Sequence, residues 1–166
     1  SPVVRLFGGL NLACSGEFEE GLHHLRESVS MDPGNPLFNA VLGTSLGENF
    51  GRLQDALVPL SISAKTGWPT AFGPLGCYQA QLGMLNEAEK TADRVALIAK
   101  EHYVPAYVSA FLSAGHGDED STLDAIERMV DETGVIVHYL PRWGSFAFLH
   151  DHPRFRSLMR RVGGEA

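Results

Sequence analysis

The sequence predicts an all-α solenoid of about four helix pairs, closed by a C-terminal capping helix. Two sets of small residues recur along the chain with nearly the same period. In the first set the spacings are 35, 32 and 34 residues, between Gly16, Gly51, Gly83 and Gly117. In the second set the spacings are 34, 33 and 34 residues, between Gly9, Gly43, Gly76 and Ala110. A period near 34 residues is typical of stacked helix pairs.

The first two repeats are predicted over residues 2–35 and 36–68. Their helices are expected at about 3–14 and 18–31, and at about 37–48 and 52–65. Apolar residues follow one helical face in the second helix, at Phe18, Leu22, Leu25 and Val29. That helix should end at Asp32-Pro33-Gly34, because Pro and Gly do not continue a helix. Pro59 lies inside the fourth predicted helix and is expected to kink it.

The third and fourth repeats are predicted over residues 69–102 and 103–134. Their helices are expected at about 70–82 and 85–100, and at about 104–115 and 119–132. The second helix of each repeat carries an apolar stripe, formed by Ala88, Ala92, Val95 and Ile98 and by Leu123, Ile126 and Val130. The period stops after residue 133.

The remaining segment, 135–166, is predicted to cap the array. Residues 135–140 could form a strand or a short helix, and a helix is favoured because every preceding element is helical. A last helix should begin near Asp151-His152-Pro153, since Asp is a good N-cap and Pro suits a first turn. It should end at Gly163-Gly164. Repeat arrays need such a cap to cover their last core face.

Composition limits the partners that the chain can bind. Its 166 residues include 13 basic and 20 acidic side chains, giving a net charge of −7. This balance argues against binding to nucleic acid and to anionic membranes, which both need many Lys and Arg side chains. Cys14 and Cys77 lie far apart without CxxC spacing, which favours a reducing, cytoplasmic location over a disulfide framework. The chain opens within a helical pattern, so we expect a fragment of a longer protein.

No catalytic residue, metal ligand or cofactor is predicted, and the chain is not expected to be an enzyme. The pairs His23-His24 and His150-x-His152 lack the i, i+4 spacing of a helical zinc site. The run Asp118–Asp120 lacks the glycine and glutamate of a calcium loop, and it suits the start of a helix, where negative charge is favourable. No serine lies in a Gly-x-Ser-x-Gly motif, and no glycine loop is followed by Lys-Ser or Lys-Thr.

Several repeat positions resemble the tetratricopeptide repeat. The first copy reads Gly16-Glu17-Phe18-Glu19-Glu20-Gly21-Leu22, with a late Asp32-Pro33. The third copy matches at Leu75-Gly76-Cys77-Tyr78 and at Gly83–Ala88, the second at Leu42-Gly43, and the fourth has Ala110 and Thr122 instead of Gly and Ala. No copy has the family's early tryptophan. The resemblance spans about residues 2–134 and implies a right-handed α-α superhelix.

The tail resembles the closing segment of certain bacterial tetratricopeptide arrays. The resemblance runs from Phe146 to Gly163 and includes Asp151-His152-Pro153-Arg154-Phe155 and the pair Arg160-Arg161. Those arrays lie C-terminal to signalling domains, often a nucleotide cyclase or a winged-helix DNA-binding domain. The resemblance therefore implies a regulatory part of a bacterial signalling protein.

In the family the first helix of each pair lines a concave groove. The residues carried over to that groove are mostly apolar and include no Lys or Arg, so a carboxylate clamp is not expected. They are Leu6, Phe7, Leu10, Leu37, Val41, Thr44, Glu48, Thr70, Cys77, Gln81, Tyr107, Val108 and Phe111. An apolar groove suits a peptide or an amphipathic helix. The function expected first is non-catalytic protein–protein interaction, and the alternatives are small-molecule sensing and self-association as a homo-oligomer.

Overall fold

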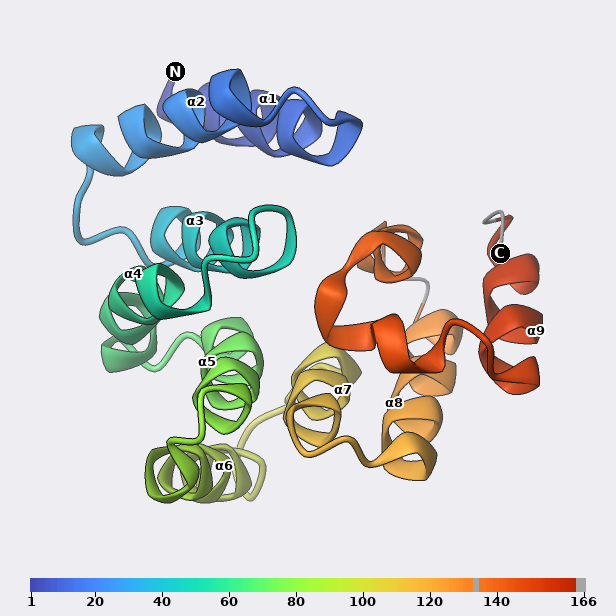
Figure 1. The fold of residues 1–166 in the computed structure, drawn as a ribbon. Coiled ribbons are helices and arrows are strands. Elements are labelled where there is room, and N and C mark those ends of the chain that lie inside the picture. Colours follow the sequence, from blue (N-terminus) through green and yellow to red (C-terminus); the bar gives the residue numbers. More distant parts are fainter. Residues whose placement is uncertain (133–134, 164–166) are drawn as a thin grey trace.

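The computed structural model describes residues 1–132 and 135–163, and consecutive helices of these residues pack in pairs (Figure 1). The pairs are α1 (Pro2–Ser15) with α2 (Phe18–Met31), α3 (Pro36–Glu48) with α4 (Leu53–Lys65), α5 (Pro69–Gln81) with α6 (Leu85–Ile98), and α7 (Ala106–Gly115) with α8 (Glu119–Asp131). The predicted all-α solenoid is confirmed. None of the described helices combines the length and the apolar character needed to cross a membrane.

The two sets of periodic small residues have different physical roles. All four glycines of the first set lie in the turn between the helices of a pair and have positive φ, from 64° at Gly51 to 95° at Gly16. Glycine adopts this backbone conformation without a steric penalty. The second set lies where helices approach closely: a Cβ on Gly9 would be 2.8 Å from the carbonyl oxygen of Gly21, and one on Gly43 would be 2.5 Å from Leu60 Cγ.

A continuous core runs through the stack of helix pairs. Leu25, Leu60, Tyr78, Phe111 and Ile126 are all fully buried in it. In two of the pairs, a buried hydroxyl near the end of the second helix also bonds to the start of the first helix. Ser28 Oγ of α2 donates to the carbonyl oxygen of Pro2 at 3.0 Å, and Ser63 Oγ of α4 donates to that of Pro36 at 2.7 Å. The same link therefore recurs in the first and second repeats.

Helix boundaries follow Pro and Gly closely, with one difference. The helix α4 continues across Pro59, from Leu53 to Lys65, so this proline does not end it. The helix α7 begins at Ala106, two residues later than expected, because Pro105 is its N-cap with an extended ψ of 144°. A residue before proline avoids helical geometry, which keeps Val104 out of the helix.

The tail is helical, as predicted, but it contains three elements. Two 3₁₀ helices, η1 (Val135–Arg142) and η2 (Gly144–Leu149), precede α9 (Pro153–Arg161). The expectation that Asp151 caps α9 is wrong. His152 is the N-cap and its ring Nδ1 accepts from the backbone N–H of Arg154 at 3.2 Å, while Asp151 pairs with Arg156 at 2.6 Å.

The helix α9 covers α8. Arg154 of α9 pairs with Asp124 of α8 at 2.8 Å. The buried side chains of α9 are Phe155, Leu158 and Met159. Residues 135–149, which we call the return segment, instead turn back into the curve formed by α3, α5 and α7 (Figure 1). The predicted boundary at residue 134 and the cap residues 164–166 lie outside the described part of the chain.

Substitution Gly21→Ala is expected to lower the free energy of unfolding by about 1–3 kcal/mol, because it overpacks the contact between α1 and α2. The new Cβ would be 2.7 Å from the backbone nitrogen of Ala13 and 2.8 Å from the carbonyl oxygen of Gly9, and backbone atoms cannot rotate away. Urea denaturation measures the change. The matched control is Gly8→Ala in α1, where nothing lies within 4 Å and alanine should stabilise the helix. Equal effects of the two substitutions would contradict the packing argument.

Candidate functional site

Glu48, at the end of α3, anchors the return segment to the concave face. The backbone N–H of Ser145 donates to Glu48 Oε2 at 3.1 Å, and Ser145 Oγ donates to Oε1 at 2.5 Å. The phenol of Tyr78 also donates to Oε1, at 2.8 Å. The carboxylate is 7% exposed and takes three hydrogen bonds from neutral donors. It therefore joins α3, α5 and η2 at one point.

Further polar contacts hold the return segment on either side of this point. Gln81 Nε2 of α5 donates to Ser145 Oγ at 3.3 Å, and the thiol of Cys77 lies 3.6 Å from the same oxygen. At the N-terminal repeat, Arg142 Nη1 donates to the carbonyl oxygen of Cys14 at 3.0 Å. The segment thus bridges the concave side from α5 to the end of α1.

Burial determines the ionisation of this cluster. Desolvation raises the pKa of Glu48, and the hydrogen bonds from Ser145 and Tyr78 oppose that rise only in part. Burial, with a smaller contribution from the charge of Glu48, raises the pKa of Cys77 to about 12. A thiol with this pKa stays protonated at neutral pH, so Cys77 lacks the thiolate that a nucleophile needs.

Aromatic side chains of the return segment fill the rest of the concave side. The ring of Phe111 in α7 lies 5.6 Å from that of Trp143 and 5.0 Å from that of Phe146, between ring centroids. Tyr139 stacks on Trp143 at 5.9 Å with an interplanar angle of 15°. Such ring pairs add stabilisation beyond the area that they bury. The return segment therefore takes the place that a groove-bound partner would occupy at these residues.

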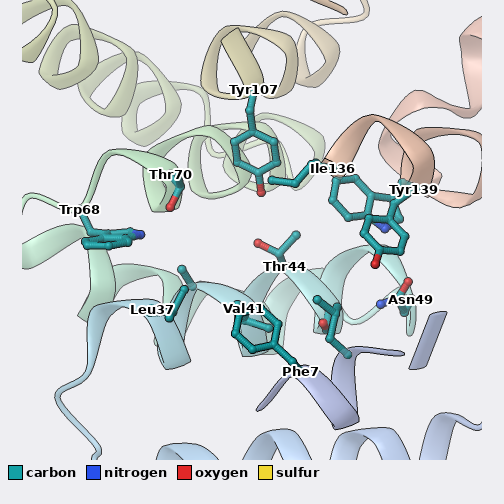
Figure 2. A pocket seen from close by; sticks show the side chains of 14 residues that line it. Phe7, Leu37, Val41, Thr44, Asn49, Trp68, Thr70, Tyr107, Ile136 and Tyr139 are labelled. Carbon is teal, nitrogen blue, oxygen red and sulfur yellow. The ribbon is translucent and has the colours of Figure 1, made fainter. Parts of the chain in front are cut away.

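A pocket of about 250 Å³ remains between the return segment and helices α1, α3, α5 and α7 (Figure 2). Figure 2 shows Trp68 at one end and Tyr139 near the other, with Leu37 and Val41 on the floor and Tyr107 opposite them. The lining residues are Phe7, Leu10, Leu37, Ala40, Val41, Thr44, Ser45, Asn49, Trp68, Thr70, Tyr107, Ile136, Tyr139 and Trp143.

None of the described residues that line this pocket carries a charge. Its polar groups are hydroxyls, one amide and the indole nitrogens, and the remaining surface is aliphatic or aromatic. Burial raises the pKa of the Tyr107 phenol well above its usual range, so this group is neutral at physiological pH. These polar atoms hardly reach the surface of the pocket, so the pocket can hold an apolar group and offers it almost no hydrogen bonds. Across residues 1–132 and 135–163, no three His, Cys, Asp or Glu side chains are grouped so that they could hold a metal ion.

The structure separates the predicted groove residues into three sets. Seven line the pocket: Phe7, Leu10, Leu37, Val41, Thr44, Thr70 and Tyr107. Four contact the return segment: Glu48, Cys77, Gln81 and Phe111. Leu6 and Val108 are fully buried in the core and do not face the pocket. Seven residues of the predicted groove are thus brought together around one cavity.

Sequence reasoning missed one wall of the pocket. Ile136, Tyr139 and Trp143 come from the return segment, and Trp68 comes from the turn before α5. The density of aromatic residues between 139 and 148 was a signal for burial. It gave no sign of which surface these residues would cover.

No family model, no curated protein and no solved structure matches this chain. The pocket and the return segment must therefore be interpreted from their own geometry and chemistry. The features that support a function are the concave shape, the aromatic and aliphatic lining, and the absence of charge among the described residues of that lining.

Substitution Glu48→Gln is expected to remove a pH-dependent contribution to stability. The folded chain binds a proton at Glu48 more tightly than the unfolded chain, whose pKa is near 4.5. The contribution of Glu48 to the free energy of unfolding is therefore fully present below pH 4.5 and declines as the pH rises through the raised pKa of the folded state. Denaturation of both proteins across this range should show wild type losing stability relative to the variant as pH rises. If wild type instead gained stability relative to the variant as the pH rose, the assignment would be contradicted.

Substitution Ser145→Ala is expected to lower the free energy of unfolding by about 1–3 kcal/mol, because the buried carboxylate of Glu48 loses a donor. The backbone N–H of Ser145 remains, so the return segment keeps one of its two bonds to Glu48. The matched control is Ser157→Ala, which lies on the exposed side of α9 and should change stability by less than about 0.5 kcal/mol. If the two substitutions cost the same, the hydroxyl of Ser145 is not an anchor.

Proposed function

We propose that this chain is a non-catalytic binding module that takes a small apolar ligand in the pocket of its concave face. The observation that carries this proposal is the pocket of about 250 Å³ that the return segment leaves between itself and the helix array. Ligand sites are typically concave and mostly apolar, with a few polar groups that set orientation. This pocket has the concave shape and the apolar lining of such sites.

The chemistry of the neighbouring polar groups supports a role without catalysis. The protonated thiol of Cys77 is a poor nucleophile. Both oxygens of Glu48 are engaged by Ser145, with Tyr78 as a further donor to one of them. These groups serve to hold the return segment, and none of them lines the pocket.

A regulatory role follows from the position of the ligand between two parts of the chain. One wall of the pocket belongs to α1, α3, α5 and α7, and the other belongs to the return segment, which leads to α9. A ligand that contacts both walls stabilises their association, since it binds that arrangement best. The resemblance of the repeats and tail to tetratricopeptide arrays of bacterial signalling proteins supports such a sensory role.

A protein partner that inserts one apolar side chain into the pocket is the second candidate. The observation that favours it is exposed apolar surface on α1, where Val3 is 44%, Val4 72% and Phe7 47% exposed. Phe7 also belongs to the pocket lining. A partner could be another protein or a second copy of this chain. A peptide bound along the whole concave side would first have to displace the return segment.

Intrinsic fluorescence tests the proposed function directly, because the only two tryptophans of the sequence, Trp68 and Trp143, both line the pocket. Titration with benzyl alcohol, a small neutral probe, should change tryptophan emission saturably. Substitution Val41→Phe places a ring in the pocket and should weaken binding at least about tenfold, the effect of a binding difference near 1.4 kcal/mol.

The matched control is Val58→Phe, which makes the same change on α4 at a side chain that is 65% exposed and outside the pocket. This variant should bind the probe like wild type. Saturable binding that survives Val41→Phe unchanged would place the probe elsewhere and sink the proposal. A tight complex with a protein partner that Val41→Phe abolishes, in the absence of any small-molecule binding, would favour the second candidate.

A further inference from the structure

We infer that two copies of this chain form a dimer through the outer face of α1, at the first end of the helix array (Figure 1). Four residues follow that face along the helix at spacings of four, three and four: Val4, Gly8, Asn11 and Ser15. We call them the end face. None of them lines the pocket of the concave side, so the inference goes beyond the proposed function.

The repeat register shows that the end face is a stacking surface. The residues 34 positions after Val4, Gly8 and Asn11 lie on α3, which contacts the preceding helices α1 and α2, and all three are buried: Phe38, Leu42 and Ser45. In α1 the same surface is uncovered, and Val4 is 72% exposed.

The third repeat shows the same stacking surface in use. Ala71, Leu75 and Tyr78 lie 33 residues after Phe38, Leu42 and Ser45, on the corresponding face of α5, and all three are buried. The phenol of Tyr78 reaches the preceding pair directly, because it donates to the carbonyl oxygen of Thr44 in α3 at 3.3 Å. Two successive repeats thus bury the surface that α1 leaves open.

The end face lacks the charge that the other exposed helix surfaces carry. Charged residues are exposed on α2, α6 and α8, among them Glu19, Arg26, Glu89, Arg94, Asp124 and Arg128. At the far end of the array, α9 exposes Arg156, Arg160 and Arg161. The terminal units of a repeat array need a polar outer face to stay in water. The end face is therefore built for contact more than for solvent.

Electrostatics favour a second copy as the occupant of this face. Each copy has a net charge of −7, so two copies repel each other wherever their carboxylates meet. No side chain of the end face carries a charge. The single charged residue in the sequence of α1, Arg5, is paired with Glu27 of α2 at 2.5 Å. The end face is thus a surface on which two copies can meet without like-charge contact.

The end face is also complementary to itself. A two-fold contact brings the same patch of both copies together, so each residue must suit the residues of an identical patch. Val4 is apolar, and the amide of Asn11 has both donors and an acceptor, so it can pair with an identical amide or with backbone groups. Spacings of four and three residues are those of a coiled-coil contact line.

Gly8 is the point of closest approach between the two helices. It is the residue of the end face without a side chain, and a Cβ added there would meet nothing within 4 Å in its own chain. Helix axes approach to about 8 Å where the contact residues are small. A two-fold axis near Gly8 brings this position opposite itself whether the helices run parallel or antiparallel. One helix from each copy makes a small contact, so we expect a reversible dimer with a Kd of about 1–100 μM.

Sedimentation equilibrium of the full chain in reducing buffer tests the inference. Wild type should dimerise in the stated range. Substitution Gly8→Asp should weaken the dimer at least about tenfold, because it brings two carboxylates together at the axis. The position is open and Asp is no worse than Gly in a helix, so the monomer should stay folded. Circular dichroism and urea denaturation check that fold.

A mixture of two variants identifies the contact as one between copies. Gly8→Arg alone should also weaken the dimer, because two cations then meet. An equimolar mixture of Gly8→Asp and Gly8→Arg should form a heterodimer at least about tenfold tighter than either homodimer, since opposite charges face each other. The matched controls are Val58→Asp and Val58→Arg on α4, at a side chain that is 65% exposed. Both should dimerise like wild type, alone and mixed.

Each other outcome overturns the inference. Wild type that stays monomeric up to about 1 mM has no such dimer. A dimer that Gly8→Asp leaves intact uses another surface, and a mixture that stays monomeric shows that position 8 does not face its copy. Benzyl alcohol titration keeps this test separate from the proposed function, because Gly8→Asp should bind the probe like wild type.

Discussion

The hydrogen bonds between Glu48 and Ser145 hold the return segment against the concave face, and the pocket depends on that contact. Ile136, Tyr139 and Trp143 form a wall only while the segment lies in this position. Both bonds are made by Ser145, and Tyr78 orients the same carboxylate from α5. One buried carboxylate thus links the helix array to the segment that closes its groove.

Burying the Glu48 carboxylate at this contact costs desolvation free energy. A buried carboxylate without a cation loses its hydration, and three neutral donors replace only part of it. The raised pKa of Glu48 reflects that imbalance. The aromatic contacts of Trp143 and Phe146 with Phe111 supply apolar burial beside it. The segment is therefore held by apolar packing and positioned by polar bonds.

Local patterns made much of the fold predictable. Gly16 and its counterparts each mark a turn with positive φ, and Gly9 and Gly43 mark close helix contacts, so the period arises from steric constraints that any copy must satisfy. The N-cap of α9 was less predictable, because His152 and Asp151 both suit the start of a helix. In the structure His152 caps α9, while Asp151 pairs with Arg156 at the surface.

The sequence alone determined the helix pairs and most of the residues on their concave side, because helical periodicity and Pro and Gly breakers act over a few residues. It predicted seven of the residues that line the pocket, but it did not show that they border one cavity. Only the tertiary structure decided where residues 135–149 lie. Their anchors join positions 97 and 128 residues apart in the chain, at Glu48 and Cys14. Such contacts depend on the shape of the assembled helix array, which no periodic pattern encodes.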